Sequence, residues 1–420
     1  MKEIKENIIS INYREEQLIK KNYIDTIPFI KENNQKNDSN LKPHKKFKLK
    51  LFVNDIDFKK IFRLLIVIDL LIKILSINEC RVFISNLSKI KLKIKGIGRQ
   101  TIYYMNKPDE IYINGNKQYV IQSQYNFDLL DNLIELVYNR DIISCNHMFY
   151  NCLGIYEIDL SNFNSSSVTN MAYMFRSCSN LVNINFSNFD TSKVTTMEGL
   201  FVYCSSLISL DLSSFDTLLV TNIDYMFDDC WSLSALNISN WNTQRVEGMS
   251  SVFYNCSSLT SLNFSNWNTT LVKKMNCMFY NCSSLTSLDI SHFTTSKVIN
   301  INGMFYNCSS LTSLNISNFD LSQTTKMQFM FYYCISLASL DLSNFNTSII
   351  IDMGYVFYNC WSLTSVNLSG WNTKNVISVA FMFYNCSSLN YLDLSSFDGS
   401  KITHFENLFY NLTSYHILIY

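Results

Sequence analysis

A phenylalanine recurs every 26 residues through the last two thirds of the chain. The series keeps its spacing without a slip and consists of Phe149, Phe175, Phe201, Phe227, Phe253, Phe279, Phe305, Phe331, Phe357, Phe383 and Phe409. A strict period of this length means that one short structural unit is copied and stacked. The sequence therefore predicts a solenoid, in which each unit buries its apolar face only against its neighbours.

We number each repeat from this phenylalanine as position 0. Apolar residues follow at positions 6, 9 and 11, as in Leu311, Leu314 and Ile316, which is the L-x-x-L-x-L pattern of a leucine-rich repeat. Positions 9 and 11 lie on one side of a strand and position 10 on the other, because strand side chains alternate. Each turn of the coil should thus contribute one short parallel strand with a buried face and a solvent face.

The second half of the repeat predicts a helix. Apolar residues such as Val168, Met171, Met174, Phe175 and Cys178 are spaced so that they form one stripe of a helix with 3.6 residues per turn. Thr or Ser just before this stretch is a candidate N-cap, as in residues 191–192. The expected fold class is therefore α/β, a leucine-rich-repeat solenoid of about ten to eleven turns, each with a parallel strand and a short helix.

Three regions follow from the pattern. Residues 1–50 are rich in Lys and Asn, have no sustained period and should form a mobile tail. Residues 51–140 do not repeat and are expected to cap the first turn. The solenoid itself should occupy residues 141–420.

Two segments before the solenoid have alternative interpretations. Residues 61–77 are apolar but contain three charged residues, and each charge near a bilayer centre costs about 2.5–3.5 kcal/mol, so a buried helix is favoured over a signal anchor. Ile90, Leu92 and Ile94 alternate with lysines. Such lysines either contact nucleic acid or lie on a solvent-facing or edge strand, where they prevent edge-to-edge pairing. We favour the second interpretation and expect no nucleic-acid partner.

Ten of the thirteen cysteines occupy position 3 of the repeat. They are Cys152, Cys178, Cys204, Cys230, Cys256, Cys282, Cys308, Cys334, Cys360 and Cys386. Side chains in register run parallel rather than converging, which disfavours disulfides and a tetrahedral zinc site. We expect a buried ladder of free thiols that act as small hydrophobes, with no metal and no cofactor.

Position 10 on the solvent face of the strand is always Asp or Asn, and serine fills position 12. The position-10 residues are Asp159, Asn185, Asp211, Asn237, Asn263, Asp289, Asn315, Asp341, Asn367 and Asp393. No two aspartates are adjacent, which avoids like charges side by side across the ladder. This Ser/Asp/Asn strip should form a flat, polar, concave surface. It either binds an extended protein or glycan partner or only keeps the sheet face soluble, and the residues leave both alternatives open.

No pattern typical of an enzyme occurs in the chain. The five histidines lie at unrelated positions of the repeat, and no H-E-x-x-H, G-x-S-x-G or P-loop motif is found. We therefore expect neither catalysis nor a small-molecule substrate. The last turn departs from the pattern and ends in an apolar strand at residues 417–420, which suggests either a missing cap or self-association through this uncapped turn.

The repeat Met-Phe-Tyr-Asn-Cys-Ser-Ser-Leu-Thr-Ser-Leu-Asp-Ile-Ser, at residues 278–291, resembles that of the BspA-like leucine-rich-repeat surface proteins. Their 26-residue repeat also occurs in mycoplasmas and microbial eukaryotes. The resemblance covers about residues 141–420 and does not extend to residues 1–80. It implies a non-enzymatic surface or secreted protein used in attachment. The chain departs from that family by showing no recognisable signal peptide, lipobox or wall anchor, so a cytoplasmic interaction scaffold is the alternative.

Overall fold

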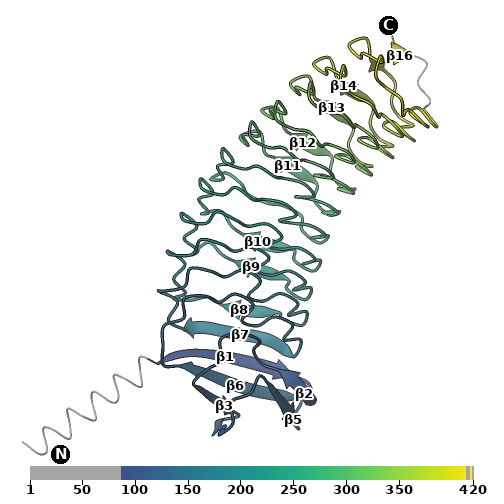
Figure 1. Cartoon of the computed structure of the whole chain (residues 1–420). Coiled ribbons are helices and arrows are strands. Elements are labelled where there is room, and N and C mark those ends of the chain that lie inside the picture. The colour runs from purple at the N-terminus through teal and green to yellow at the C-terminus, as the bar shows by residue number, and fades with distance from the viewer. Residues whose placement is uncertain (1–86, 413–416, 419–420) are drawn as a thin grey trace, which may run out of the picture. The chain divides into compact units, whose positions relative to one another are not determined.

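The computed structural model describes residues 87–412 and 417–418. Contacts divide the chain into two units between residues 75 and 76, and all described residues lie in the second unit. The tail at 1–50 and the apolar segment at 61–77 lie outside the described residues, so the predictions for them stay predictions. Within the second unit, Figure 1 shows a sheet that is followed by stacked turns of chain.

The N-terminal part of this unit is a six-stranded sheet in the order β4-β3-β6-β1-β7-β8. Its strands are β1 (Ser88–Lys95), β3 (Glu110–Ile113), β4 (Asn116–Lys117), β6 (Asp131–Tyr138), β7 (Ile155–Asn162) and β8 (Asn183–Asn185). A separate two-stranded antiparallel sheet pairs β2 (Gly98–Thr101) with β5 (Gln124–Phe127). Strand β7 belongs to the first repeat, and it pairs antiparallel with β1 and parallel with β8. The sheet before the solenoid thus continues directly into the stacked strands.

The lysine-rich strand β1 lies inside this sheet, between β6 and β7. Ile90, Leu92 and Ile94 are fully buried, whereas the alternating lysines lie on the opposite, more exposed face. Lys89 pairs with Glu135 at 3.0 Å and Lys93 with Glu157 at 2.6 Å. Of the two alternatives for the lysines, the solvent-facing strand holds and the edge strand is wrong, because both edges of β1 are paired. Acidic residues on the neighbouring strands offset the lysine charges instead.

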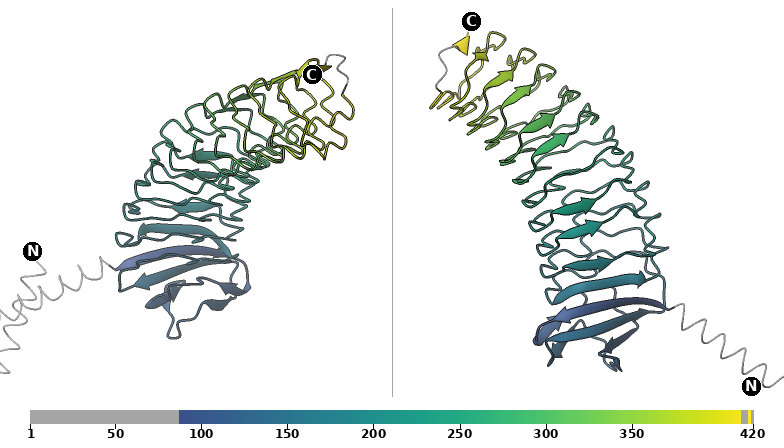
Figure 2. Two further views of the ribbon diagram at one scale, coloured as in Figure 1. Left: turned by 45° about the horizontal axis from the view of Figure 1, so that its top comes forward. Right: turned by 180° about the vertical axis from the view of Figure 1, so that it is seen from behind.

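After the first repeat, the repeats contribute strands of only two or three residues. These are β9 (Ser209–Asp211), β10 (Ala235–Asn237), β11 (Ser287–Asp289), β12 (Ser313–Asn315), β13 (Ser339–Asp341), β14 (Ser365–Asn367), β15 (Leu392–Asp393) and β16 (Ile417–Leu418). These strands pair two by two, in parallel and in register, so that Leu288 lies beside Leu314 and Leu340 beside Val366. Figure 2 shows the short strands following one another along one wall of the coil. The strand half of the predicted repeat is confirmed.

Columns of identical side chains fill the core. The position-0 phenylalanines stack from Phe149 to Phe409 with ring centroids 5.3–6.3 Å apart. Beside them each cysteine from Cys178 to Cys386 donates its thiol to the carbonyl of the phenylalanine one turn earlier, with Sγ–O distances of 3.1 Å. The ten position-3 cysteines are free and buried, as predicted.

A column of buried threonines closes the other side of the coil. The Thr243 hydroxyl donates to the carbonyl of Asn268 at 2.9 Å and accepts the amide hydrogen of the same residue at 2.7 Å. Equivalent threonines repeat this exchange in other turns, for example Thr269 with Thr294. Each hydroxyl therefore satisfies one backbone donor and one backbone acceptor of the next turn, which allows these polar groups to be buried.

The predicted helix is wrong, because no residue that the structure describes is helical. Its place is taken by a run of tight turns in which alternate amides point in different directions. The Phe175 amide donates to the carbonyl of Leu200 in the next turn, whereas the Cys178 amide donates back to Phe175. An α-helix would keep all such bonds within one segment. The solenoid is thus a β-solenoid, and the expected α/β class is corrected.

Left-handed backbone conformations explain why the helix does not form. In nearly every turn, positions −2 and +2 have positive φ, as in Tyr173 at +56° and Ser177 at +62°. A residue in this region ends a right-handed helix, and non-glycine residues adopt it at a cost of about 1–2 kcal/mol. Asn tolerates it best, and Asn is frequent at position +2, while Gly199 occupies position −2. Thr191 consequently caps no helix; its hydroxyl donates to the Asp216 carbonyl of the next turn.

Candidate functional site

The Ser/Asp/Asn strip follows the register of the strands. Asp211 lies beside Asn237, Asp289 beside Asn315, and Asp341 beside Asn367 in the paired strands. Most of the position-10 side chains are exposed, whereas Asp159, Asn185 and Asp393 are half-buried. Parallel pairing places equivalent residues about 4.8 Å apart, so adjacent strip residues can contact one extended molecule.

Each position-10 side chain also has a local structural role. In all ten repeats its oxygen accepts the backbone amide hydrogen of the serine two residues later, at N–O distances of 2.9–3.3 Å. This is an Asx turn, which Asp and Asn form equally well through a side-chain oxygen. The turn explains why the position is restricted to these two residue types. The second side-chain polar atom can make further contacts, as Nδ2 of Asn185 does with Oδ1 of Asp159 at 3.0 Å.

These turns also keep the aspartates of the strip charged. The backbone amide and the hydroxyl of Ser213 lower the pKa of Asp211, and those of Ser343 lower the pKa of Asp341. The serine hydroxyl and amide likewise lower the pKa of Asp289 and of Asp393. Hydrogen bonds to a carboxylate favour its ionised form. The strip therefore presents separated negative charges within a neutral amide and hydroxyl surface.

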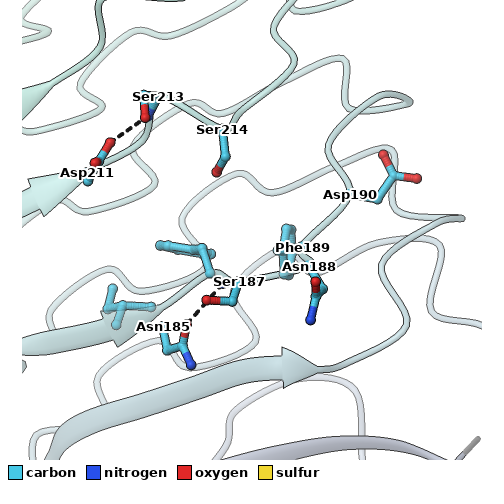
Figure 3. A pocket seen from close by; sticks show the side chains of 10 residues that line it. Asn185, Ser187, Asn188, Phe189, Asp190, Asp211, Ser213 and Ser214 are labelled. Carbon is cyan, nitrogen blue, oxygen red and sulfur yellow. Dashed lines mark hydrogen bonds between the residues drawn. The ribbon is translucent and has the colours of Figure 1, made fainter.

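Near the start of the strip the surface is hollowed by a cavity of about 650 Å³. It lies between two successive repeats and is lined by Ile184, Asn185, Phe186, Ser187, Asn188, Phe189, Asp190, Asp211, Ser213 and Ser214. In Figure 3, Asn185 bonds to Ser187 and Asp211 to Ser213, while the other labelled polar side chains are spread around the opening. The lining is mostly polar, and the two phenylalanines are buried beneath it.

A shortened side chain accounts for this hollow. At position 13, Asn188 and Asn240 each donate to the carbonyl of the position-12 serine one repeat earlier, at 3.4 and 3.2 Å. The intervening repeat carries Ser214 at this position, and serine is too short to make the same bridge to Ser187. The two repeats are therefore not linked here, and the surface opens between them.

A second hollow of about 400 Å³ lies on the strip itself, over β13, β14 and β15. Its lining includes Asp341, Asn367 and Asp393 from the strip, together with Tyr391. Tyr391 replaces the serine that is frequent at position 8, and the residue is 48% exposed. The sequence predicted the three strip residues but not Tyr391 or the residues beside Ser214. In the sequence, these two places are marked by a residue that departs from the repeat and not by a repeated residue.

The site holds no arrangement typical of metal binding or nucleophilic catalysis. Among residues 87–412, no group of three His, Cys, Asp or Glu side chains is placed to hold a metal ion. The ladder cysteines are buried and lie away from the strip, and burial raises the pKa of Cys178 to about 12. A thiol with so high a pKa is not a nucleophile at neutral pH. The described residues also include no helix long and apolar enough to cross a membrane.

Comparison with solved structures gives distant similarities. A leucine-rich repeat protein from Eubacterium ventriosum is 18% identical, with coverage of 62% of this chain and 83% of that one and a TM-score of 0.26. The functional domain of InlJ from Listeria monocytogenes, whose description includes a cysteine ladder, is 13% identical, with coverage of 64% and 63% and a TM-score of 0.21. The chain of a TLR13–ssRNA13 complex is also 13% identical, with a TM-score of 0.22; 66% of this chain is covered, but only 48% of that one.

A comparison with curated proteins gives no match. A family model described as "Mycoplasma protein of unknown function, DUF285" matches residues 143–259, 225–340 and 333–419. The three matches overlap and together include most of the repeats, which is more than half of the chain. The chain therefore belongs to this family of Mycoplasma-type repeat proteins of unknown function.

Proposed function

We propose that this protein is a non-enzymatic recognition solenoid that attaches to an extended protein or glycan through the Ser/Asp/Asn strip. The observation that carries the proposal is the in-register placement of polar side chains in the paired strands, with hollows of about 650 and 400 Å³ at two places. Ligand sites have volumes of about 300–1,000 Å³, and these shallow polar hollows suit side groups of a long partner.

The chemistry of the strip favours a partner with many hydroxyl, amide or cationic groups. Amides and serine hydroxyls both donate and accept hydrogen bonds, and the aspartates accept them as charged groups. Each contact is exposed and individually weak, so affinity would come from many contacts along the strip. Loss of one aspartate should accordingly reduce affinity only slightly.

An attachment role is tested by presenting the purified chain to an array of glycans and extended peptides. Binding to either class supports the proposal, and binding to neither would contradict it. The combined substitutions Asp211→Lys, Asp289→Lys and Asp341→Lys should then weaken binding at least tenfold. Unchanged affinity in this variant would reject the strip as the binding surface.

A matched control separates binding from folding. Asp216, Asp320 and Asp398 lie at position 15, outside the strip and outside the linings of both hollows, and each accepts the amide hydrogen of the residue two positions later. Their combined replacement by lysine changes the charge equally and removes the same kind of turn bond. This control should bind as the native chain does, and an equal loss of affinity would mean that net charge or stability is responsible.

Surface attachment is supported by the resemblance to BspA-like proteins, and an intracellular scaffold, in which no Asn-Cys-Ser sequence would carry a glycan, is the alternative. Asn281 donates to Asn255 and accepts from Asn307, so the side chains of these three Asn-Cys-Ser sequences form a ladder across turns. A glycan on any of them would break the ladder. Protease treatment of intact cells separates the two roles: cleavage of the chain supports surface display, and full protection supports the scaffold.

A further inference from the structure

A column of stacked tyrosines runs along the tight-turn segments of the solenoid, apart from the Ser/Asp/Asn strip. The residue after the position-0 phenylalanine is tyrosine in seven successive repeats: Tyr254, Tyr280, Tyr306, Tyr332, Tyr358, Tyr384 and Tyr410. We call this column the tyrosine ladder. Neighbouring ring centroids are 4.1–4.7 Å apart, and the ring planes are parallel to within 12°.

The backbone imposes this close stacking. In each repeat the phenylalanine amide donates to the residue that precedes the next phenylalanine, as Phe279 donates to Met304 at 2.9 Å. This bond fixes the register of the tyrosines that follow. A second aromatic column, formed by Phe329, Tyr355 and Phe381, lies beside the ladder. Within this column, neighbouring ring centroids are 4.8–4.9 Å apart. Rings at such separations usually prefer offset or edge-on contacts, so the parallel ladder reflects the repeat.

The ladder is reachable from solvent at its edge. Its rings from Tyr254 to Tyr384 are half-buried, and Tyr410 is 55% exposed. Burial, followed by a hydrogen bond between the hydroxyls of Tyr280 and Tyr306, raises the pKa of Tyr280. Burial likewise raises the pKa of Tyr332. These phenols are therefore protonated at neutral pH and do not repel one another as phenolates would.

We propose that the tyrosine ladder is a modification site at which a one-electron oxidant of the peroxidase class couples tyrosines of adjacent repeats into dityrosine. Each of two neighbouring phenols gives one electron to the oxidant and one proton to solvent. The two phenoxyl radicals then form a carbon–carbon bond between the ring carbons next to their oxygens. Each of these carbons passes its hydrogen to its own oxygen as the ring becomes aromatic again, so the pair loses two electrons and two protons in total.

The geometry favours this coupling within the ladder. Parallel rings at 4.1 Å, as in Tyr280 and Tyr306, oppose the ring carbons face to face, which is the approach that lets two half-filled π orbitals overlap. Holding two reacting groups this close replaces a bimolecular encounter by an effectively unimolecular step. The open edge of the column gives the coupled rings room to turn out of the stack. The bond would join residues that are 26 positions apart and staple one turn of the solenoid to the next.

The experiment oxidises the purified full-length chain with a peroxidase and hydrogen peroxide. We expect dityrosine fluorescence, a yield that does not depend on protein concentration, and cross-linked peptides whose tyrosines are 26 residues apart in the ladder. A yield that rises with protein concentration, or bands of doubled mass on denaturing gels as the main product, would overturn the proposal. Cross-links that join ladder tyrosines to tyrosines outside the ladder would also overturn the proposal.

A variant with alternate rungs removed tests the need for adjacent phenols. Tyr280→Phe, Tyr332→Phe and Tyr384→Phe together leave no two neighbouring tyrosines in the ladder but keep every ring, since Phe329 already stacks on Tyr355 in the native chain. Dityrosine should fall about tenfold, because the remaining ladder phenols are two turns apart, and Tyr333 and Tyr355 are tilted against Tyr358 at 5.9 and 5.8 Å rather than stacked on it. An undiminished yield would overturn the proposal.

The control removes the same number of tyrosines elsewhere. Tyr119, Tyr203 and Tyr391 are exposed and lie outside the ladder, with Tyr119 97% exposed. Their combined replacement by phenylalanine should leave the yield of intramolecular dityrosine unchanged. Loss of yield in this control would show that exposure, rather than stacking, selects the reacting tyrosines. Circular dichroism of both variants verifies that each is folded before oxidation.

Discussion

The early and late repeats share one backbone but carry different outer side chains. Position 1 holds Tyr150, Arg176, Val202 and Asp228 in the first four repeats, whereas the following seven repeats carry the uniform tyrosine ladder. The late column stacks ring on ring. In the early column, Nε of Arg176 and Oδ1 of Asp228 are buried without a hydrogen-bond partner. The comparison shows that a solenoid tolerates a mixed column, but that identical residues satisfy one another better than unlike ones do.

The inner phenylalanine stack should contribute equally to stability in the early and the late repeats. Phe201 and Phe305 are both fully buried and each stacks on two neighbours, at 5.5 and 5.7 Å and at 5.8 and 5.6 Å. Replacing either by alanine should lower the free energy of unfolding by about 3–5 kcal/mol, because a large cavity opens in the core. Denaturant unfolding of the two variants measures this loss.

The losses in the free energy of unfolding for Phe201→Ala and Phe305→Ala are then compared. Equal losses would show that early and late repeats differ only on the outside. A much smaller loss for Phe305→Ala would mean that the tyrosine ladder holds the late repeats together without the core. Phe329→Ala serves as the control, since this ring is 37% exposed and its loss should cost clearly less.

Asp228 should make the early repeats sensitive to pH. Burial first, and then the charge of Asp229, raise the pKa of Asp228 to about 7, while Arg176 opposes the shift. An unfolded aspartate titrates near pH 3.9, so between about pH 4 and 7 the folded state binds the extra proton. Stability contributed by this protonation is present at low pH and is lost as the pH rises to about 7. Asp228→Asn should remove this dependence.

The measurement is thermal unfolding of the native chain and of Asp228→Asn at several pH values. The variant should unfold at a higher temperature than the native chain at pH 8 and at nearly the same temperature at pH 4. A constant difference at all pH values would assign the effect to packing instead. The late repeats provide the control, because Tyr280→Phe at the equivalent position removes a phenol whose pKa burial raises further above this range.

The amount of structure that the sequence predicts also differs between the two halves of the repeat. The strand, the buried cysteines and the polar strip follow from the alternation of Leu314, Asn315 and Ile316 and from the fixed place of Cys308. The helix prediction is wrong because the stacked turns bury residues at the same spacing as one stripe of an α-helix. What separates the two is the left-handed backbone at positions −2 and +2, whose signs in the sequence are the frequent asparagine at position +2 and the glycines Gly199 and Gly303 at position −2.

The candidate site shows the same limit. The period located the strip, but both hollows arise where a single residue departs from the repeat, at Ser214 and Tyr391. Such departures are visible in the sequence only after the structure shows what the usual residue does. For Ser214, the informative fact is that Asn188 and Asn240 bridge to the preceding repeat.

Restoring that bridge should have the smallest effect on stability and a larger one on binding. Ser214→Asn would place an amide within reach of the Ser187 carbonyl and close the 650 Å³ hollow. One added hydrogen bond contributes about 0.5–1.5 kcal/mol, so denaturant unfolding should show a slight gain. The reverse change, Asn240→Ser, should open a second hollow and cost a similar amount. If the hollow receives part of the partner, Ser214→Asn weakens binding despite its greater stability. Unchanged affinity would place the contact elsewhere along the strip, with the hollow over β13 to β15 as the next position to test.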